Sequence, residues 1–140
     1  MKRNLLLVAA LTAVAGAGCA TAASEPEMSA KAAERLAEFK PTGETRSCLT
    51  LTEIRSIDAV DDSHFLVETR GGEHYLNKIS GRCSGASQMG NHISYTVSTN
   101  QLCRNEIITV VDSMNGMIVG SCGLGDFEKL EDAPQPAEEN

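Results

Sequence analysis

The sequence predicts a mainly β protein: a small antiparallel β-barrel or sandwich of six to seven strands with a short N-terminal helix, stapled by disulfides. Short β-rich runs alternate with turn residues from Arg46 onward. An even set of four cysteines remains when Cys19, at the end of an apolar leader, is set aside. The chain also has three Phe, two Tyr and no Trp, so its core is mostly aliphatic and benefits from covalent cross-links.

Residues 1–18 form a predicted signal peptide. Lys2 and Arg3 precede the apolar stretch Leu5 to Ala17, and small residues follow it. A helix over that stretch spans about 20 Å, which is too short for a hydrocarbon core of about 30 Å. We therefore expect an exported protein that contacts a membrane only through a lipid anchor.

Two processing routes are open at the end of the leader. The run Ala15 to Cys19 resembles a bacterial lipobox, whose cysteine is lipidated, although Gly16 stands where leucine is usual. Cleavage after Ala22 or Ala23 would instead remove Cys19. We favour lipidation, because a cysteine directly after the apolar stretch has no other evident reason to be there.

The chain after the leader is predicted to comprise a tether and short helix at 19–43, a β domain at 44–130 and a disordered acidic tail at 131–140. The helix is expected over Ser29 to Lys40, with Ser29 as its N-cap and with Pro41 and Gly43 ending it. About three helical turns are marginal alone, so we expect the helix either to pack Leu36 and Phe39 on the domain or to fray.

Alternation and turn residues predict the strands Cys48–Ile54, Arg55–Val60, His64–Thr69, Glu73–Ile79, His92–Ser98, Ile107–Asp112 and Met117–Cys122. Tight turns are expected at 61–63, 70–72 and 115–116. Asp61 and Asp62 are adjacent in the first turn, so we expect them to stabilise it rather than share a proton. The strand at 107–112 is apolar on both faces, which predicts a central strand covered on its second face by the helix or a barrel wall.

Four cysteines permit three disulfide connectivities. We favour Cys48 with Cys122, because these residues begin the first strand and end the last, which are neighbours in a closed barrel. Cys83 and Cys103 then pair across the strand that they flank. A zinc site is the alternative, but no two of these cysteines have CxxC spacing and an exported protein meets oxidising conditions.

No set of catalytic residues is indicated in the sequence as strongly as the disulfide-bonded cysteines are. The run 81–85 fits G-x-C-x-G, but no helical pattern follows it and Cys83 is expected in a disulfide. His64, His74 and His92 lie on separate predicted strands without metal-ligand spacing. We therefore expect that the protein is not an enzyme and that it has no cofactor and no metal site.

Four arginines lie near strand ends or beside cysteines, and two polar residues lie on a predicted strand. Together they define a candidate ligand face for an anionic or carbohydrate ligand: Arg55, Arg70, Arg82 and Arg104, with Tyr75 and Asn77. The alternative is that the arginines form ordinary surface ion pairs. The formal net charge of −7 disfavours binding to nucleic acid.

The segments CLTLTEIRS, VDDSHFLVETRGGEHYLNKISGRC, LCRNEIITVVD and GSCGLGDFEKL together resemble a family of small exported bacterial proteins known as a domain of unknown function. The resemblance covers about Arg46 to Leu130. It implies a bacterial cell-envelope location and these family residues: Cys48, Arg55, Tyr75, Asn77, Cys83, Cys103 and Cys122. It implies no activity, ligand or catalytic residue.

The sequence therefore favours a cell-envelope binding or structural module, periplasmic or lipid-anchored to the outer membrane, with an envelope glycan or envelope protein as its partner. The alternative is an inhibitor or accessory factor of an envelope enzyme. In that case the long, polar, glycine-rich loop from Ser80 to Asn91 is the element expected to contact the enzyme.

Overall fold

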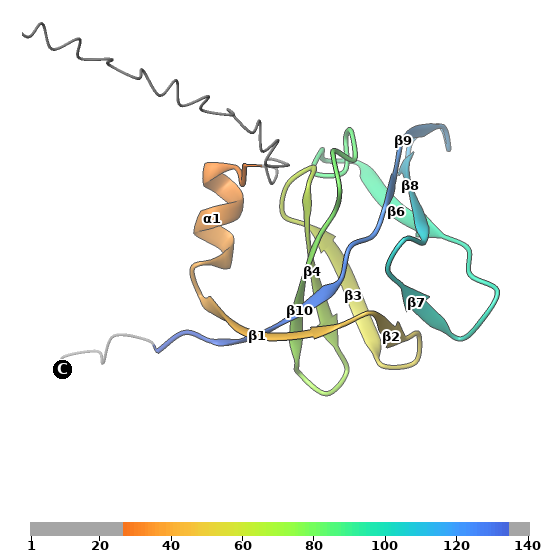
Figure 1. The fold of residues 1–140 in the computed structure, drawn as a ribbon. Coiled ribbons are helices and arrows are strands. Elements are labelled where there is room, and N and C mark those ends of the chain that lie inside the picture. Colours follow the sequence, from red (N-terminus) through yellow and green to blue (C-terminus); the bar gives the residue numbers. More distant parts are fainter. Residues whose placement is uncertain (1–26, 135–140) are drawn as a thin grey trace, which may run out of the picture.

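The computed structural model describes residues 27–134, so the predicted signal peptide, Cys19 and residues 135–140 of the predicted tail lie outside the described residues. The elements are α1 (Ala30–Leu36), β1 (Phe39–Arg46), β2 (Cys48–Thr50), β3 (Ile54–Ala59), β4 (His64–Thr69), β5 (His74–Lys78), β6 (Asn91–Tyr95), β7 (Gln101–Cys103), β8 (Ile107–Asp112), β9 (Ile118–Gly123) and β10 (Phe127–Asp132) (Figure 1). Over this range no helix is both long enough and apolar enough to cross a bilayer.

The strands form three antiparallel sheets, with the orders β1-β10-β5-β4-β3, β2-β7 and β6-β8-β9. The predicted fold class is confirmed: residues 27–134 are mainly β, antiparallel and disulfide-linked, with one short helix. The sheets do not close into a barrel, and the strands number ten rather than six or seven.

One core lies between the five-stranded sheet and the two smaller sheets. Phe65, Tyr75 and Phe127 come from the large sheet, and Leu102 and Ile108 come from the small ones. All five side chains are at most 2% exposed. Burial of apolar area on this scale is the main favourable contribution to folding, and here it holds sheets together that share no hydrogen-bonded ladder.

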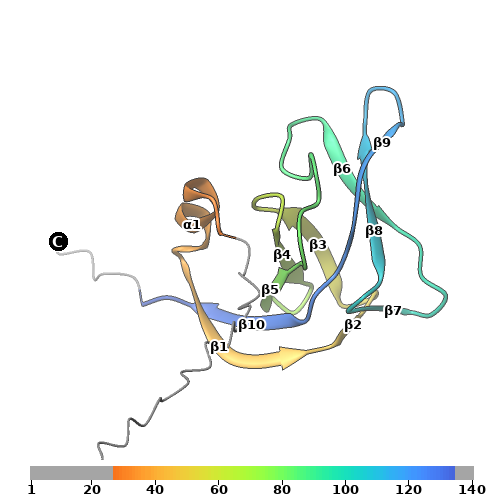
Figure 2. The same ribbon diagram turned by 45° about the horizontal axis from the view of Figure 1, so that its top comes forward.

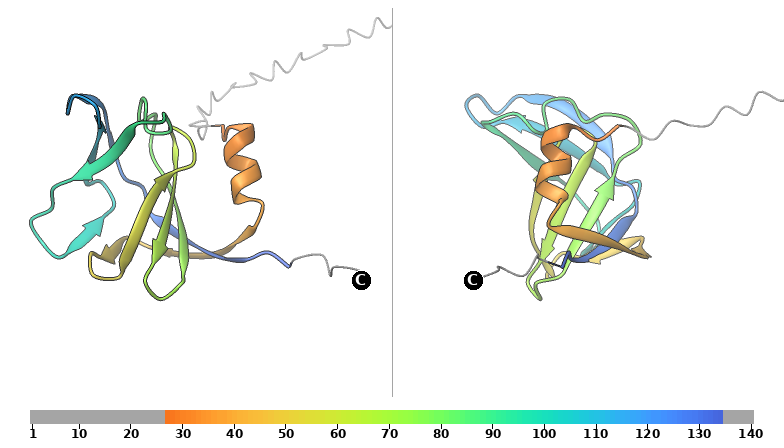
Figure 3. Two further views of the ribbon diagram at one scale, coloured as in Figure 1. Left: turned by 180° about the vertical axis from the view of Figure 1, so that it is seen from behind. Right: turned by 90° about the vertical axis from the view of Figure 1, so that its left-hand side faces the viewer.

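The helix covers the other face of the five-stranded sheet (Figure 3). Ala32 is fully buried against Leu66 and Leu76, with Leu36 and Phe39 packed beside them. The helix therefore packs on the domain through Leu36, as predicted, whereas Phe39 packs there from β1 and not from the helix. Ser29 is its N-cap as expected, because the Ser29 hydroxyl accepts a hydrogen bond from the Ala32 N–H at 3.2 Å.

Three strands, β1, β7 and β10, were not predicted, and the composition of β1 and β10 hides them. β1 contains Pro41 and Gly43, which were interpreted as the stop of a helix reaching Lys40, although α1 ends at Leu36. Proline is tolerated here because β1 is an edge strand. β10 carries four charged residues in six and extends through Glu131 and Asp132, which had been assigned to the tail. The sheet thus extends beyond both predicted limits of the β domain.

Strand β8 is central in its sheet, as predicted, but its second face is not covered. Ile108 and Val110 are fully buried, whereas Ile107 on the opposite face is 58% exposed. The helix instead covers β4, whose Leu66 faces α1 while Phe65 and Val67 face the main core. The sequence pattern of apolar residues on both faces therefore pointed to β8, whereas β4 is the strand that is covered on both faces.

The favoured disulfide pairing is wrong: the bonds are Cys48–Cys103 and Cys83–Cys122. The expectation assumed that a closed barrel makes the first and last predicted strands neighbours. β2 pairs with β7 instead, and the register places Cys48 directly opposite Cys103. The remaining bond joins the β5–β6 loop, through Cys83, to Cys122 on β9.

Peptide mapping without reduction should recover this pairing. Trypsin alone leaves Cys83 and Cys103 in one peptide, so cyanogen bromide cleavage after Met89 is needed to separate them. We expect peptide 47–55 linked to a peptide that contains Cys103, and a peptide ending at Met89 linked to one that contains Cys122. A link between Cys48 and Cys122 would contradict the topology.

Each bond closes a long loop and should contribute about 4 kcal/mol to the free energy of unfolding.

Candidate functional site

A polar cleft of about 520 Å³ opens between the start of α1, the β3–β4 turn and the β5–β6 loop. Its polar and charged lining includes Ser29, Lys31, Asp61, Asp62, Arg82 and Ser87. We call it the Asp61–Asp62 cleft. Of the residues predicted for the ligand face, it contains only Arg82.

Asp61 joins the start of α1 to the β3–β4 turn. One carboxylate oxygen accepts hydrogen bonds from the backbone N–H groups of Ser63 and His64, at 2.7 and 2.8 Å, and contacts His64 Nδ1 at 2.9 Å. Because a carboxylate only accepts, Nδ1 carries the proton. The other oxygen accepts from the Ser29 N–H at 3.0 Å, which fixes the start of α1. Burial acts to raise the pKa of Asp61, but these hydrogen bonds outweigh it and lower the pKa below its ordinary value.

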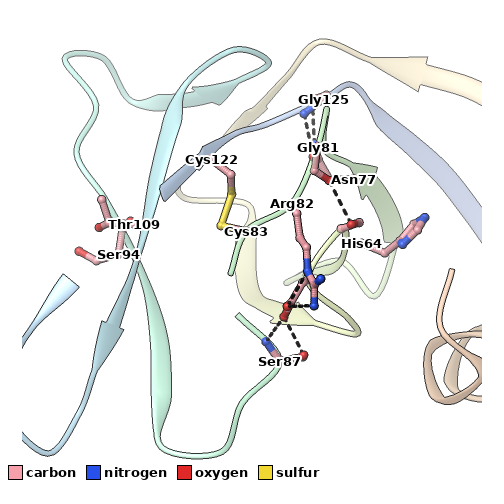
Figure 4. Close-up of a disulfide and its surroundings, with 12 residues drawn as sticks. His64, Asn77, Gly81, Arg82, Cys83, Ser87, Ser94, Thr109, Cys122 and Gly125 are labelled. Atoms are coloured by element: carbon pink, nitrogen blue, oxygen red, sulfur yellow. Dashed lines mark hydrogen bonds and ion pairs between the residues drawn. A yellow bond between two sulfur atoms is a disulfide. The ribbon is translucent and has the colours of Figure 1, made fainter. Parts of the chain in front are cut away.

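Asp62 holds the β5–β6 loop. One carboxylate oxygen accepts from Arg82 Nε and Nη2, at 3.2 and 3.1 Å, and the other from the Ser87 hydroxyl and N–H, at 2.9 and 3.2 Å. Figure 4 shows Arg82 and Ser87 turned toward this carboxylate. Burial acts to raise the pKa of Asp62, yet the bonds to Ser87 and Arg82 lower it. The two aspartates therefore stabilise local structure, as predicted, and share no proton.

The β5–β6 loop is held at several further points. The Cys83 N–H donates to the Asp62 carbonyl at 2.6 Å, and Cys83 is bonded to Cys122 (Figure 4). Asn91 Nδ2 donates to the Gly85 carbonyl at 2.8 Å. The loop also lies against β9, where a side chain in place of Gly120 would meet the Ser84 carbonyl. The loop is thus a preorganised surface, although it has no regular secondary structure.

The cleft can donate and accept hydrogen bonds, but it does not assemble a nucleophile. Ser63 donates its hydroxyl to the Gly81 carbonyl, and Ser87 donates to Asp62, so neither hydroxyl is bonded to His64. Cys83 is in a disulfide, which confirms that interpretation of its G-x-C-x-G run. Between residues 27 and 134 no group of three or more His, Cys, Asp or Glu is placed to hold a metal ion.

The candidate ligand face is not assembled in the structure. Tyr75 and Asn77 are 2% and 0% exposed, so they belong to the interior. Three of the four arginines form the ion pairs weighed as the alternative, Arg55 with Glu68, Arg82 with Asp62 and Arg104 with Asp126. Arg70 is exposed in the β4–β5 turn, and its N–H donates to the Glu53 carbonyl.

Asn77 joins β5 to the segment between β9 and β10. Its side chain donates to the Gly125 carbonyl at 2.8 Å and accepts from the Gly125 N–H at 2.9 Å (Figure 4). The two backbones approach so closely that a side chain at position 125 would meet the Lys78 carbonyl. The role of Asn77 is therefore structural, and the sequence indicated its importance but not the reason.

Tyr75 supports a charged network that includes a residue overlooked in the sequence, Arg46. Arg46 Nη1 lies 2.7 Å from a Glu53 carboxylate oxygen and 3.3 Å from the Tyr75 hydroxyl. Hydrogen bonds to Tyr75 and then Glu53 raise the pKa of Arg46. Lys129 contacts Glu73 at 2.6 Å, and this contact lowers the pKa of Glu73. Arg46 precedes the first predicted strand, so no periodicity marked it.

Replacing Asn77 with alanine should lower the free energy of unfolding by about 1–3 kcal/mol, because both backbone groups of Gly125 lose their partner. Urea unfolding measures the change. The matched control is Asn100→Ala, since Asn100 is exposed and its replacement should change stability by less than about 0.5 kcal/mol. Equal effects of the two substitutions would contradict the structural role of Asn77.

Asp61 should make folding dependent on pH. Its pKa is lower in the folded chain than the ordinary 3.8, so its stabilisation is complete above that value and is lost as pH falls through the folded pKa. Asp61→Asn should therefore reduce stability near pH 7 and flatten the loss of stability on acidification. Thermal unfolding between about pH 7 and pH 3 tests this.

Asp58→Asn is the control for that experiment, because Asp58 is exposed at an edge strand and accepts only from the Ser56 hydroxyl. Its pH profile should follow that of the unmodified chain. A profile of Asp61→Asn that also follows the unmodified chain would show that Asp61 does not connect the helix to the turn.

Comparisons with known proteins were made for the whole chain. No curated protein and no solved structure matches it. Residues 1–137 match the family described as "Family of unknown function (DUF6491)", so the match includes all the residues that the structure describes. The chain therefore belongs to the DUF6491 family.

Proposed function

We propose that the protein is an exported module of the bacterial cell envelope that binds a partner through the Asp61–Asp62 cleft and the adjoining β5–β6 loop. The observation that carries the proposal is the fixation of this loop by the Cys83–Cys122 bond and by Asp62. An ordered loop loses little conformational entropy when it binds, so preorganisation increases affinity. The proposal assigns no catalytic step.

The proposed location in the cell envelope is supported by the two disulfides and by the expected lipidation of Cys19. Two disulfides are compatible with an oxidising compartment outside the cytosol. The apolar leader and Cys19 favour export followed by lipidation, with the domain held at the outer membrane or released into the periplasm if Cys19 is removed.

The chemistry of the cleft limits the partner. Arg82, with a side chain 75% exposed, and Lys31 offer N–H donors at its rim, and Ser87 offers a hydroxyl. No aromatic ring is among the described lining residues, so an envelope glycan would have hydrogen bonds but no stacking platform. This favours a polar protein surface, and hence the alternative of an accessory factor or inhibitor of an envelope enzyme.

Site-specific photo-crosslinking in living cells tests the proposal. A photoreactive residue at Gln88, exposed in the loop, should form an adduct with one component of the envelope fraction, whereas the same residue at Thr99, exposed beyond β6, should not. A protein adduct supports the accessory-factor form and a glycan adduct the glycan-binding form. Absence of an adduct at Gln88, or equal adducts at both positions, would reject binding through this loop.

The anchor is tested in the same cells with a labelled fatty acid. The label should enter the unmodified chain and be lost from Cys19→Ser. Label that persists in the variant would exclude Cys19 as the lipidated residue, without bearing on the crosslink at Gln88.

A further inference from the structure

Three methionines are exposed at one end of the three-stranded sheet. Met89, Met114 and Met117 are 102%, 93% and 64% exposed. Met89 lies in the β5–β6 loop just before β6, and the other two lie in the turn between β8 and β9. We call these three residues the methionine tip.

The backbone ladder brings the two segments of the tip together. Asn91 on β6 is paired with Asp112 on β8, and beyond this pair the Ser113 N–H donates to the Gly90 carbonyl at 2.8 Å. Met89 precedes Gly90 and Met114 follows Ser113, so these two methionines lie in adjacent turns at the same end of the sheet. Figure 2 shows the β8–β9 hairpin rising beside the start of β6.

Met117 is held at the same end by the turn. The Asp112 N–H donates to the Met117 carbonyl at 2.9 Å, and the Met117 N–H donates to Asn115 Oδ1 at 2.9 Å. One Asp112 carboxylate oxygen accepts from the Met114 N–H at 2.7 Å. The backbone of the turn is therefore ordered, whereas the three thioether side chains are free to rearrange. The Asp112 carboxylate also places negative charge beside them.

The donor atoms at the tip favour a soft metal ion. Thioether sulfur is a ligand for soft ions such as Cu(I) and a poor one for Mg²⁺, Ca²⁺ or Mn²⁺. The four domain cysteines are in disulfides and offer no thiolate. In an oxidising compartment thioethers remain as soft ligands when thiols are lost.

The nearest imidazole does not belong to this set. His92 Nδ1 contacts the Ser113 hydroxyl at 2.9 Å, and the register sets His92 beside Val111. Met117 lies opposite Asp112, the next residue on β8, and successive residues of a strand point to opposite faces. His92 and Met117 therefore point to opposite faces of the sheet, and the candidate metal ligands are the three methionine sulfur atoms alone.

We propose that Met89, Met114 and Met117 form a surface site for one soft monovalent metal ion, Cu(I) or its redox-inert analogue Ag(I). Binding forms metal–sulfur bonds without transfer of electrons or protons. The competing role for the same residues is an apolar contact surface. Leucine separates the two roles, because it preserves apolar volume and removes the sulfur.

Titration of the full chain carrying Cys19→Ser, which removes the one thiol outside the two disulfides, with silver nitrate in chloride-free buffer tests the site. With ¹³C-methyl-labelled methionine, the methyl signals of Met89, Met114 and Met117 should shift together and saturate at one Ag(I) per chain. Met28, which lies beside α1 and is 36% exposed, provides the internal control and should not shift.

Each of Met89→Leu, Met114→Leu and Met117→Leu should weaken Ag(I) binding by at least the roughly 10–100-fold that loss of a supporting residue costs a metal site. Met28→Leu should leave the affinity unchanged. The circular dichroism spectra of all variants should match that of the unmodified chain. Unchanged affinity in the three variants, equal shifts of Met28, or saturation at several ions per chain would overturn the site. None of these results depends on the partner proposed for the Asp61–Asp62 cleft.

Discussion

Burial of β4 on both faces is the constraint on which the rest of the fold depends. Leu66 must be covered on one side, and α1 does this with Ala32. Phe65 and Val67 must be covered on the other face, and residues of the two smaller sheets do so, among them Ile108 on β8. A single strand thus determines which face each of the other layers occupies, and the β3–β4 turn at its start is where these layers meet.

That meeting point explains why the cleft lies where it does. The turn carries Asp61, which bonds to the start of α1, and Asp62, which bonds to the β5–β6 loop. A carboxylate can accept several hydrogen bonds at once, so two adjacent aspartates can fix two separate segments without further secondary structure. The same bonds occupy the oxygens of both carboxylates, whereas the charged groups of Glu27, Lys31 and Arg82 belong to exposed residues of the cleft.

The parts of the fold encoded by local pattern were predictable from sequence. The Ser29 cap, the alternation in β4 and the hairpin turns depend on residues close in the chain, and the structure contains them. The partners of the cysteines were not predictable, because they depend on β2 pairing with β7, a contact over 50 residues apart in sequence. β10 was hidden for a similar reason: only Phe127 and Leu130 are buried, and its charged residues suit an exposed tail equally well. For the candidate site, the structural role of Asp61 and Asp62 was predictable, but the composition of the cleft was not.

The two disulfides are placed unevenly, and this bears on how the molecule is stabilised. Neither bond lies within the five-stranded sheet, whose strands are held by the ladder and by apolar cores on both faces. Cys48–Cys103 ties the two strands of the smallest sheet, and Cys83–Cys122 ties the loop to β9. The three-stranded sheet has one apolar core face and an outer face that exposes Ile107 and Ile118. Covalent cross-links therefore reinforce the half of the molecule whose burial is least complete, and that half presents both the preorganised loop and the methionine tip.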